Sequence, residues 1–188
     1  MWIEQPGDGS DDLFDEYDAF VEKHVRDPGP FLDGHDLLCG EGYVAFHEIT
    51  RDLFEERTVY NLARLNLNTR HPNAGYRYAE EADDPSILRA EFTPSTPFCP
   101  QAHTLTIGSF RAWNGLTEQH DYDLGRVCAT PMHHDSGSIN DRLADIEETF
   151  EEIGSVEGID DPSGSLGPSS SPSQSSSGIG DLTENAPF

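Results

Sequence analysis

The spacing of apolar residues changes along this chain, and that change limits what it can fold into more than any other feature. Tyr43, Phe46 and Leu53 recur at helical spacing, which predicts an amphipathic helix with one buried face. From Leu88 to Phe92 apolar residues instead alternate with polar ones, which is typical of a half-buried strand. Because helices mix irregularly with mostly hairpin-linked strands, the sequence predicts an α+β layered fold.

Capping and chain-breaking residues bound the expected elements. Ser10 is a suitable N-cap for the first helix, and Asp-Pro-Gly-Pro at 27–30 ends it. We expect a small mixed sheet of three to four strands packed against two to three helices, with an N-terminal helical extension and a disordered C-terminal tail. The predicted helices are 11–26, 41–57, 101–116 and 138–152, and the predicted strands are 63–67, 76–79, 88–92 and 121–129.

Composition divides the chain into three parts. Residues 1–40 read as an acidic helical extension and 41–152 as the α+β domain. Residues 153–188 contain a Ser/Gly/Pro tract and no Lys or Arg. Such a segment buries too little apolar surface to offset its ordering entropy, so we expect it to be disordered.

The chain is strongly acidic, with 36 acidic and 11 basic residues, a net charge of −25 and Lys23 as its only lysine. Molar salt shortens the Debye length to about 3 Å and screens the repulsion among such charges. We therefore interpret the composition as adaptation to a high-salt cytoplasm. The alternative is an ordinary acidic protein with an acidic tail.

Charge and cysteine content also exclude several classes of function. No segment supplies the basic patch that nucleic acids or anionic membrane surfaces require. No run approaches the ~18 apolar residues of a membrane span, and the first residues lack the apolar core of a signal peptide. The odd number of cysteines, three, suits free thiols in a reducing compartment, so we expect a cytoplasmic protein.

Cys99 is the strongest candidate for chemistry. It follows a predicted strand, lies between Pro97 and Pro100, and precedes a predicted helix. The positive end of that helix would lower the pKa of the thiol, and the thiolate is both a nucleophile and a soft metal ligand. The alternative is that Cys99 is a small buried apolar residue.

Other candidates are weaker. His133 and His134 precede the last predicted helix and could act as ligands or proton carriers, although paired loop histidines are more often solvated. His103 follows Cys99 at i+4, so the two could face each other. Cys128, late in a strand, reads as structural, and Cys39 carries little weight. The sequence leaves the roles of His103, His134, Cys39 and Cys128 open.

The stretch Leu-Arg-Ala-Glu-Phe-Thr-Pro-Ser-Thr-Pro-Phe-Cys-Pro, ending at Pro100, resembles the iron–sulfur cluster assembly domain family. That family includes the SufT and PaaD-like proteins and the eukaryotic cytosolic iron–sulfur targeting factors. The C-terminal stretch is also similar, with His133 before an Asn-x-x-Leu-Ala-Asp-x-Glu helix that begins at Asn140. The likeness covers about 41–152. Where the family carries Asp-Pro-Glu after its first helix, this chain reads Phe-Glu-Glu-Arg from Phe54.

The resemblance implies a non-enzymatic adaptor or transient carrier in iron–sulfur protein maturation. Cys99 would be the cargo-binding residue, and His133 a further metal ligand. Its partners would be client proteins and the assembly machinery, and a second copy in a homodimer is an additional expectation. A cluster usually takes a full set of thiolate ligands, so one cysteine implies transient rather than tight binding.

Three alternatives remain open from the sequence. A thiol enzyme would use Cys99 as nucleophile and His103 or His133 as base. A protein-interaction module would leave the cysteine idle. A structural zinc site would combine Cys99, Cys128 and the histidines.

Overall fold

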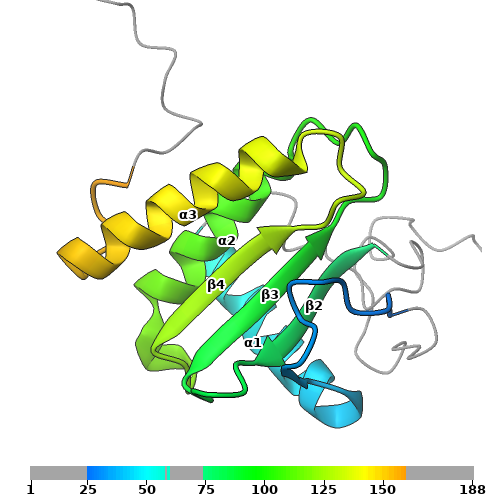
Figure 1. Cartoon of the computed structure of the whole chain (residues 1–188). Helices are drawn as coiled ribbons and strands as arrows, with labels where there is room; N and C mark the ends of the chain where they lie inside the picture. Colours follow the sequence, from blue (N-terminus) through cyan, green and yellow to red (C-terminus); the bar gives the residue numbers. More distant parts are fainter. Residues whose placement is uncertain (1–24, 58, 60–73, 160–188) are drawn as a thin grey trace, which may run out of the picture.

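The structure is a computed structural model that describes residues 25–57, 59 and 74–159 (Figure 1). The predicted strand 63–67 and residues 160–188 of the predicted tail lie outside these residues. The predicted helix 11–26 also lies outside them, apart from its last two residues.

A single four-stranded mixed sheet forms the centre of the described domain, with strand order β1-β2-β3-β4. β1 pairs with β2 and β2 with β3 in antiparallel fashion, whereas β3 and β4 are parallel. The α+β class and mixed sheet expected from the sequence are therefore confirmed. The strands are β1 (Asp36–Leu37), β2 (Gly75–Glu80), β3 (Ile87–Thr93) and β4 (Leu124–Ala129).

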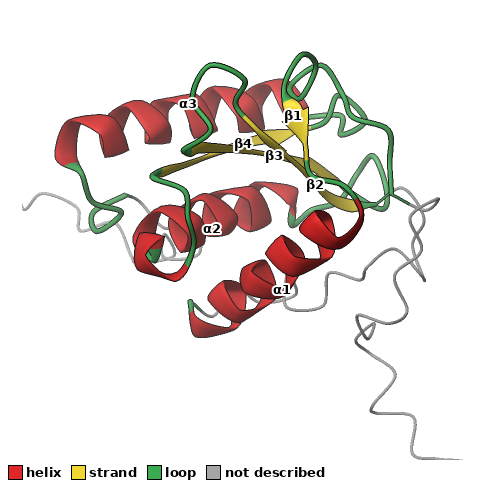
Figure 2. Cartoon of the chain, turned by 90° about the horizontal axis from the view of Figure 1, so that it is seen from below, coloured by secondary structure: helices red, strands yellow, loops and turns green. Residues whose placement is uncertain are grey.

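Helices cover both sides of this sheet. α1 (Gly40–Glu56) and α2 (Ala102–Gly115) pack on one face, and α3 (Ser136–Ile153) runs along β4 on the side opposite α1 (Figure 2). A short 3₁₀ turn, η4 (Thr117–Gln119), follows α2. These helices agree with the predicted ones to within two residues at each end. None of the described helices is long and apolar enough to cross a lipid bilayer.

The core lies largely between the sheet and the α1–α2 layer and contains a cluster of aromatic side chains. Trp113 of α2 is fully buried, and its ring contacts those of Phe54, Tyr76 and Tyr78. The tyrosine hydroxyls also have partners: that of Tyr76 donates to Ser109 Oγ at 2.7 Å. The aromatic side chains are therefore buried without leaving those polar groups unsatisfied.

The packed domain extends beyond the predicted limits of 41–152 at both ends. On the N-terminal side, Leu32 is buried and β1 adds a strand to the sheet. On the C-terminal side, Val156 and Ile159 join the core, and Val156 lies against Gly115 of α2. Single apolar anchors in a Gly/Ser/Asp-rich context do not show in local composition, which is why the sequence placed these boundaries too far inward.

Two asparagines protect the outer edge of β4. Asn114 of α2 accepts a hydrogen bond from the Gly125 N–H and donates one to the Gly125 carbonyl, both at 2.8 Å. Asn140 of α3 does the same at Ala129, at 2.7 and 3.0 Å. The side-chain amides thus replace a fifth strand and leave these edge groups unavailable for pairing with another chain.

Removing one of these clamps should destabilise the domain. Asn114→Ala deletes the partners of two buried main-chain groups, so we expect the free energy of unfolding to fall by about 2–4 kcal/mol. Denaturant unfolding monitored by Trp fluorescence measures the change. Asp141→Ala, at an exposed position of α3, is the control and should change stability by less than about 0.5 kcal/mol. Equal stabilities for the two variants would contradict the clamp.

Candidate functional site

The loops after β3 and β4 form one surface. Loop 94–101 leads from β3 to α2, and loop 130–135 leads from β4 to α3. Because β3 and β4 are parallel, both loops leave the sheet at the end where these two strands finish, and α2 and α3 begin there. Open sheets with parallel strands commonly bind ligands at this C-terminal end of the strands.

Hydrogen bonds from two adjacent histidines fasten the loops together. The His133 Nε2–H donates to the Cys99 carbonyl at 2.9 Å, and its Nδ1 accepts from the Asp135 N–H at 3.1 Å. Both the backbone N–H and the Nδ1–H of His134 donate to the Pro97 carbonyl, at 3.0 and 2.9 Å. The position of the Cys99 loop is thus set by the neighbouring loop.

Cys99 itself lies half-buried beside an exposed aromatic ring. Its side chain packs against the edge of the core, and its carbonyl accepts a 3.3 Å hydrogen bond from the N–H of Ala102, the first residue of α2. The neighbouring Phe98 is 71 % exposed, and its ring lies 5.0 Å from that of His134. The loop thus presents an apolar side chain next to a thiol at the start of a helix.

The predicted partners of Cys99 are not arranged as expected. Both ring nitrogens of His133 are engaged and the residue is 4 % exposed, so the side chain holds the loop, with its imidazole at the Cys99 carbonyl rather than the thiol. Its role as a metal ligand stays a prediction from the sequence. His103 shows no hydrogen bond to the Cys99 thiol. Within the described residues, no three His, Cys, Asp or Glu side chains gather to hold a metal ion.

Of the two histidines, His134 is the better candidate ligand. It is exposed, and its Nε2 makes no hydrogen bond in the part of the chain that the structure describes. Cys128 lies on the sheet face away from α1 and α2. The exposed Cys39 precedes α1 and accepts a 3.6 Å hydrogen bond from Arg77.

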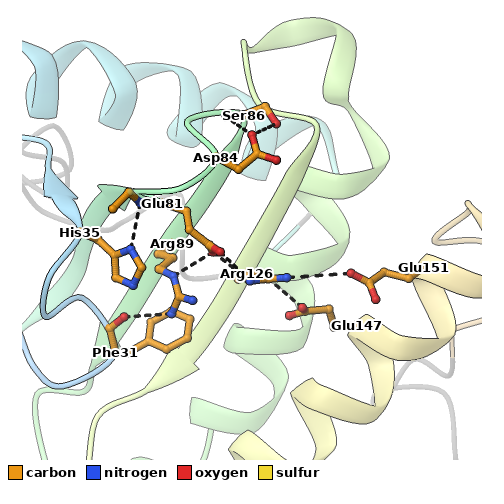
Figure 3. Close-up of polar contacts among 10 residues, drawn as sticks. Phe31, His35, Glu81, Asp84, Ser86, Arg89, Arg126, Glu147 and Glu151 are labelled. Carbon is orange, nitrogen blue, oxygen red and sulfur yellow. Dashed lines mark hydrogen bonds and ion pairs between the residues drawn. The ribbon is translucent and has the colours of Figure 1, made fainter.

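The sheet face away from α1 and α2 carries a network of charges (Figure 3). The Glu81 carboxylate lies between the guanidinium groups of Arg89 and Arg126, at 3.0 and 2.8 Å. Arg126 also reaches Glu147 of α3 at 2.9 Å. Burial raises the pKa of Glu147 more than Arg126 lowers it. The network therefore ties α3 to the sheet through partly buried charges.

A polar row crosses the same face closer to the candidate loops. Arg77, Glu91 and Cys128 are register partners on β2, β3 and β4. Glu91 is 1 % exposed, and one of its oxygens accepts a 2.8 Å hydrogen bond from the Gly29 N–H. Burial, reinforced by the Glu91 charge, raises the pKa of the Cys128 thiol from 9.0 to about 11. Cys128 is therefore a protonated thiol at neutral pH.

A coil segment, residues 25–35, lies over Glu91 of this row, and we call it the strap. Beneath it, Glu91 Oε2 is buried without a hydrogen-bond partner in the described structure. A buried group without a partner costs about 1–3 kcal/mol. Sequence reasoning missed the row because polar residues on alternate strand positions predict a solvated face. The spacing of residues along the chain also does not predict that Gly29 lies against the Glu91 carboxylate.

The raised pKa of Cys128 makes stability depend on pH. The unfolded thiol ionises near its ordinary value and the native one only near 11, so its contribution falls as pH rises from about 9 to 11. Wild type should therefore lose more stability over this interval than Cys128→Ala. Denaturant unfolding at several pH values measures the difference, with Cys39→Ala as the exposed-thiol control. Parallel curves for wild type and Cys128→Ala would contradict the assignment.

Comparison with known proteins gives a family. No curated protein and no solved structure matches the chain significantly. A sequence family described as "domain of unknown function (DUF7998)" matches residues 12–157, which include the whole sheet, all three helices and both candidate loops. Since the match extends over well more than half of the sequence, the chain belongs to the DUF7998 family.

Proposed function

We propose that this protein is an iron–sulfur cluster assembly or targeting factor that acts as an adaptor and transient carrier through Cys99. The proposal rests on the motif around Cys99 and on the geometry of the loop that bears it. Its partners would be iron–sulfur client proteins and the assembly machinery in a high-salt cytoplasm. The protein would pass on cargo rather than turn over a substrate.

The observation that carries the proposal is the character of loop 94–101. All residues of this loop are uncharged in a chain of net charge −25. Phe98 is the most exposed large apolar side chain among the described residues. Exposed apolar side chains in such surroundings mark protein contacts. A partner that covers Phe98 would also cover the adjacent Cys99. This supports docking and cargo handling at one place.

Ligand chemistry is consistent with a transient role. Clusters are usually held by four thiolates, and Cys99 is the only cysteine on these two loops. His134 is the neighbouring side chain with a nitrogen available to a metal. The remaining ligands would come from a client protein or from a second copy of the chain. Release to the client then requires exchange of the few ligands that this protein supplies for ligands of the client.

An interaction module without metal is the second candidate, because the exposure of Phe98 alone favours it. The thiol-enzyme alternative has less support. Of its two proposed bases, His103 makes no hydrogen bond to the Cys99 thiol in the described structure, and His133 uses both ring nitrogens to hold the loops. A base must reach the thiol to activate it.

The cargo role can be tested by anaerobic reconstitution with iron and sulfide. Wild type should develop visible charge-transfer absorption and bind iron, whereas Cys99→Ser should return to the level of a sample without protein. Cys39→Ser, which removes an exposed thiol away from these loops, is the matched control and should bind as wild type does. Equal iron content in Cys99→Ser and wild type would remove Cys99 from the proposal.

Docking is tested separately with Phe98→Ala. This variant should keep its iron uptake but lower the activity of iron–sulfur client enzymes in cells. If client activity falls with Phe98→Ala and is unchanged with Cys99→Ser, the metal-free interaction module is the better description.

A further inference from the structure

Glu91 is a buried carboxylate whose charge is only partly compensated. The residue is 1 % exposed, and its Oε1 accepts a 2.8 Å hydrogen bond from the Gly29 N–H. The other oxygen, Oε2, has no hydrogen-bond partner in the part of the chain that the structure describes. Buried charges in proteins are ordinarily paired or coordinate a metal. Glu91 therefore has one acceptor position to which a cation can bind.

The two arginines nearest to Glu91 on the sheet bond to other groups. Arg77, its register partner on β2, donates to Cys39 Sγ at 3.6 Å and to a main-chain carbonyl at 2.9 Å. Arg89, two residues earlier on β3, is paired with Glu81 at 3.0 Å. Their guanidinium groups thus leave the Oε2 atom of Glu91 without a bonded cation among the described residues.

A thiol lies beside this carboxylate on the next strand. Cys128 of β4 is the register partner of Glu91, on the same face of the sheet. Burial first, and then the Glu91 charge, raise the pKa of the Cys128 thiol, so the two groups are within electrostatic reach of each other. Cys128 is only partly buried, which leaves a route from solvent to this residue.

A third polar group without a partner follows on β4. Thr130 continues the ladder two residues after Cys128, because its N–H donates to the Phe92 carbonyl at 2.9 Å. Residues two positions apart on a strand share a face, so Thr130 lies on the side of Glu91 and Cys128. It is 1 % exposed, and its Oγ1 has no hydrogen-bond partner within the described ranges. Two neighbouring strands thus offer a carboxylate oxygen, a thiol and a hydroxyl on one face.

We propose that Glu91, Cys128 and Thr130 form a second site that binds one thiophilic divalent cation of the Zn²⁺ class. Glu91 Oε2 and Cys128 Sγ bind the ion directly, water fills its remaining positions, and the Thr130 hydroxyl holds one of these waters. On binding, the Cys128 S–H bond breaks, its proton goes to solvent, and the sulfur forms a metal–thiolate bond without electron transfer. The two positive charges of the ion then balance one carboxylate and one thiolate.

The donor set selects the class of cation. Thiolate and carboxylate together suit Zn²⁺ and Cd²⁺, whereas Ca²⁺ and Mg²⁺ take oxygen ligands. Structural zinc sites are closed by four protein ligands, so a site with two direct protein ligands holds an exchangeable ion. The proposal does not depend on any cargo at Cys99.

Titration of the full chain with Cd²⁺ tests the proposal, because a Cd²⁺–thiolate bond gives an ultraviolet charge-transfer band that carboxylates do not give. Cys39→Ser and Cys99→Ser are combined, which leaves Cys128 as the only thiol. We expect a band that saturates at one Cd²⁺ per chain and disappears when Zn²⁺ competes. Glu91→Gln in this background should weaken binding roughly tenfold or more, since even residues that only support metal ligands contribute that much.

Glu148→Gln, at an exposed position of α3, is the matched control and should leave the band and the affinity unchanged. Denaturant unfolding supplies a second readout that does not need the Glu91 variant. Cd²⁺ should stabilise the background chain but not the same chain with Cys128→Ser. A missing band, or an unchanged affinity in folded Glu91→Gln, would overturn the proposal.

Discussion

The parallel pairing of β3 with β4 is the constraint on which the rest of this structure depends. Parallel pairing requires a crossover connection, which α2 supplies. It also places the loops that follow β3 and β4 at the same end of the sheet. Because those loops meet, His133 and His134 can fasten the segment that bears Cys99. The same register sets Glu91 beside Cys128 on the opposite face from the core. One strand pair therefore creates both the candidate site and the polar row.

The two faces of the sheet are stabilised in different ways. On the side of α1 and α2, apolar burial with a cluster of aromatic rings dominates, and the hydroxyl of Tyr76 and the indole N–H of Trp113 have partners. On the other side, the strap buries Leu32 and Glu91, and Arg126 joins Glu81 to Glu147 of α3 through partly buried charges. The first face is therefore held mainly by apolar packing, and the second also by polar and ionic contacts.

The uncharged loop 94–101 belongs to a strongly acidic protein. The chain carries a net charge of −25, yet loop 94–101 has no charged residue. At low salt, repulsion among acidic surfaces would oppose the approach of another acidic protein, whereas molar salt reduces the screening distance to about 3 Å. Under such screening, an exposed apolar residue such as Phe98 can approach another surface without that long-range repulsion. The acidic surface and the uncharged loop are thus compatible with docking in a salt-rich solution.

Sequence alone determined the local features of this protein. Hydrophobic spacing predicted α1, α2, α3 and most of β2 to β4, because helical and alternating periods are properties of consecutive residues. It also placed Cys99 in a loop between a strand and a helix. Only the tertiary structure decided that His133 holds a carbonyl, that Glu91 lies beside Cys128 beneath Gly29, and that Val156 and Ile159 belong to the core. These pairs are far apart along the chain or lie on different strands, so their contact follows from strand register and packing, which no local pattern encodes.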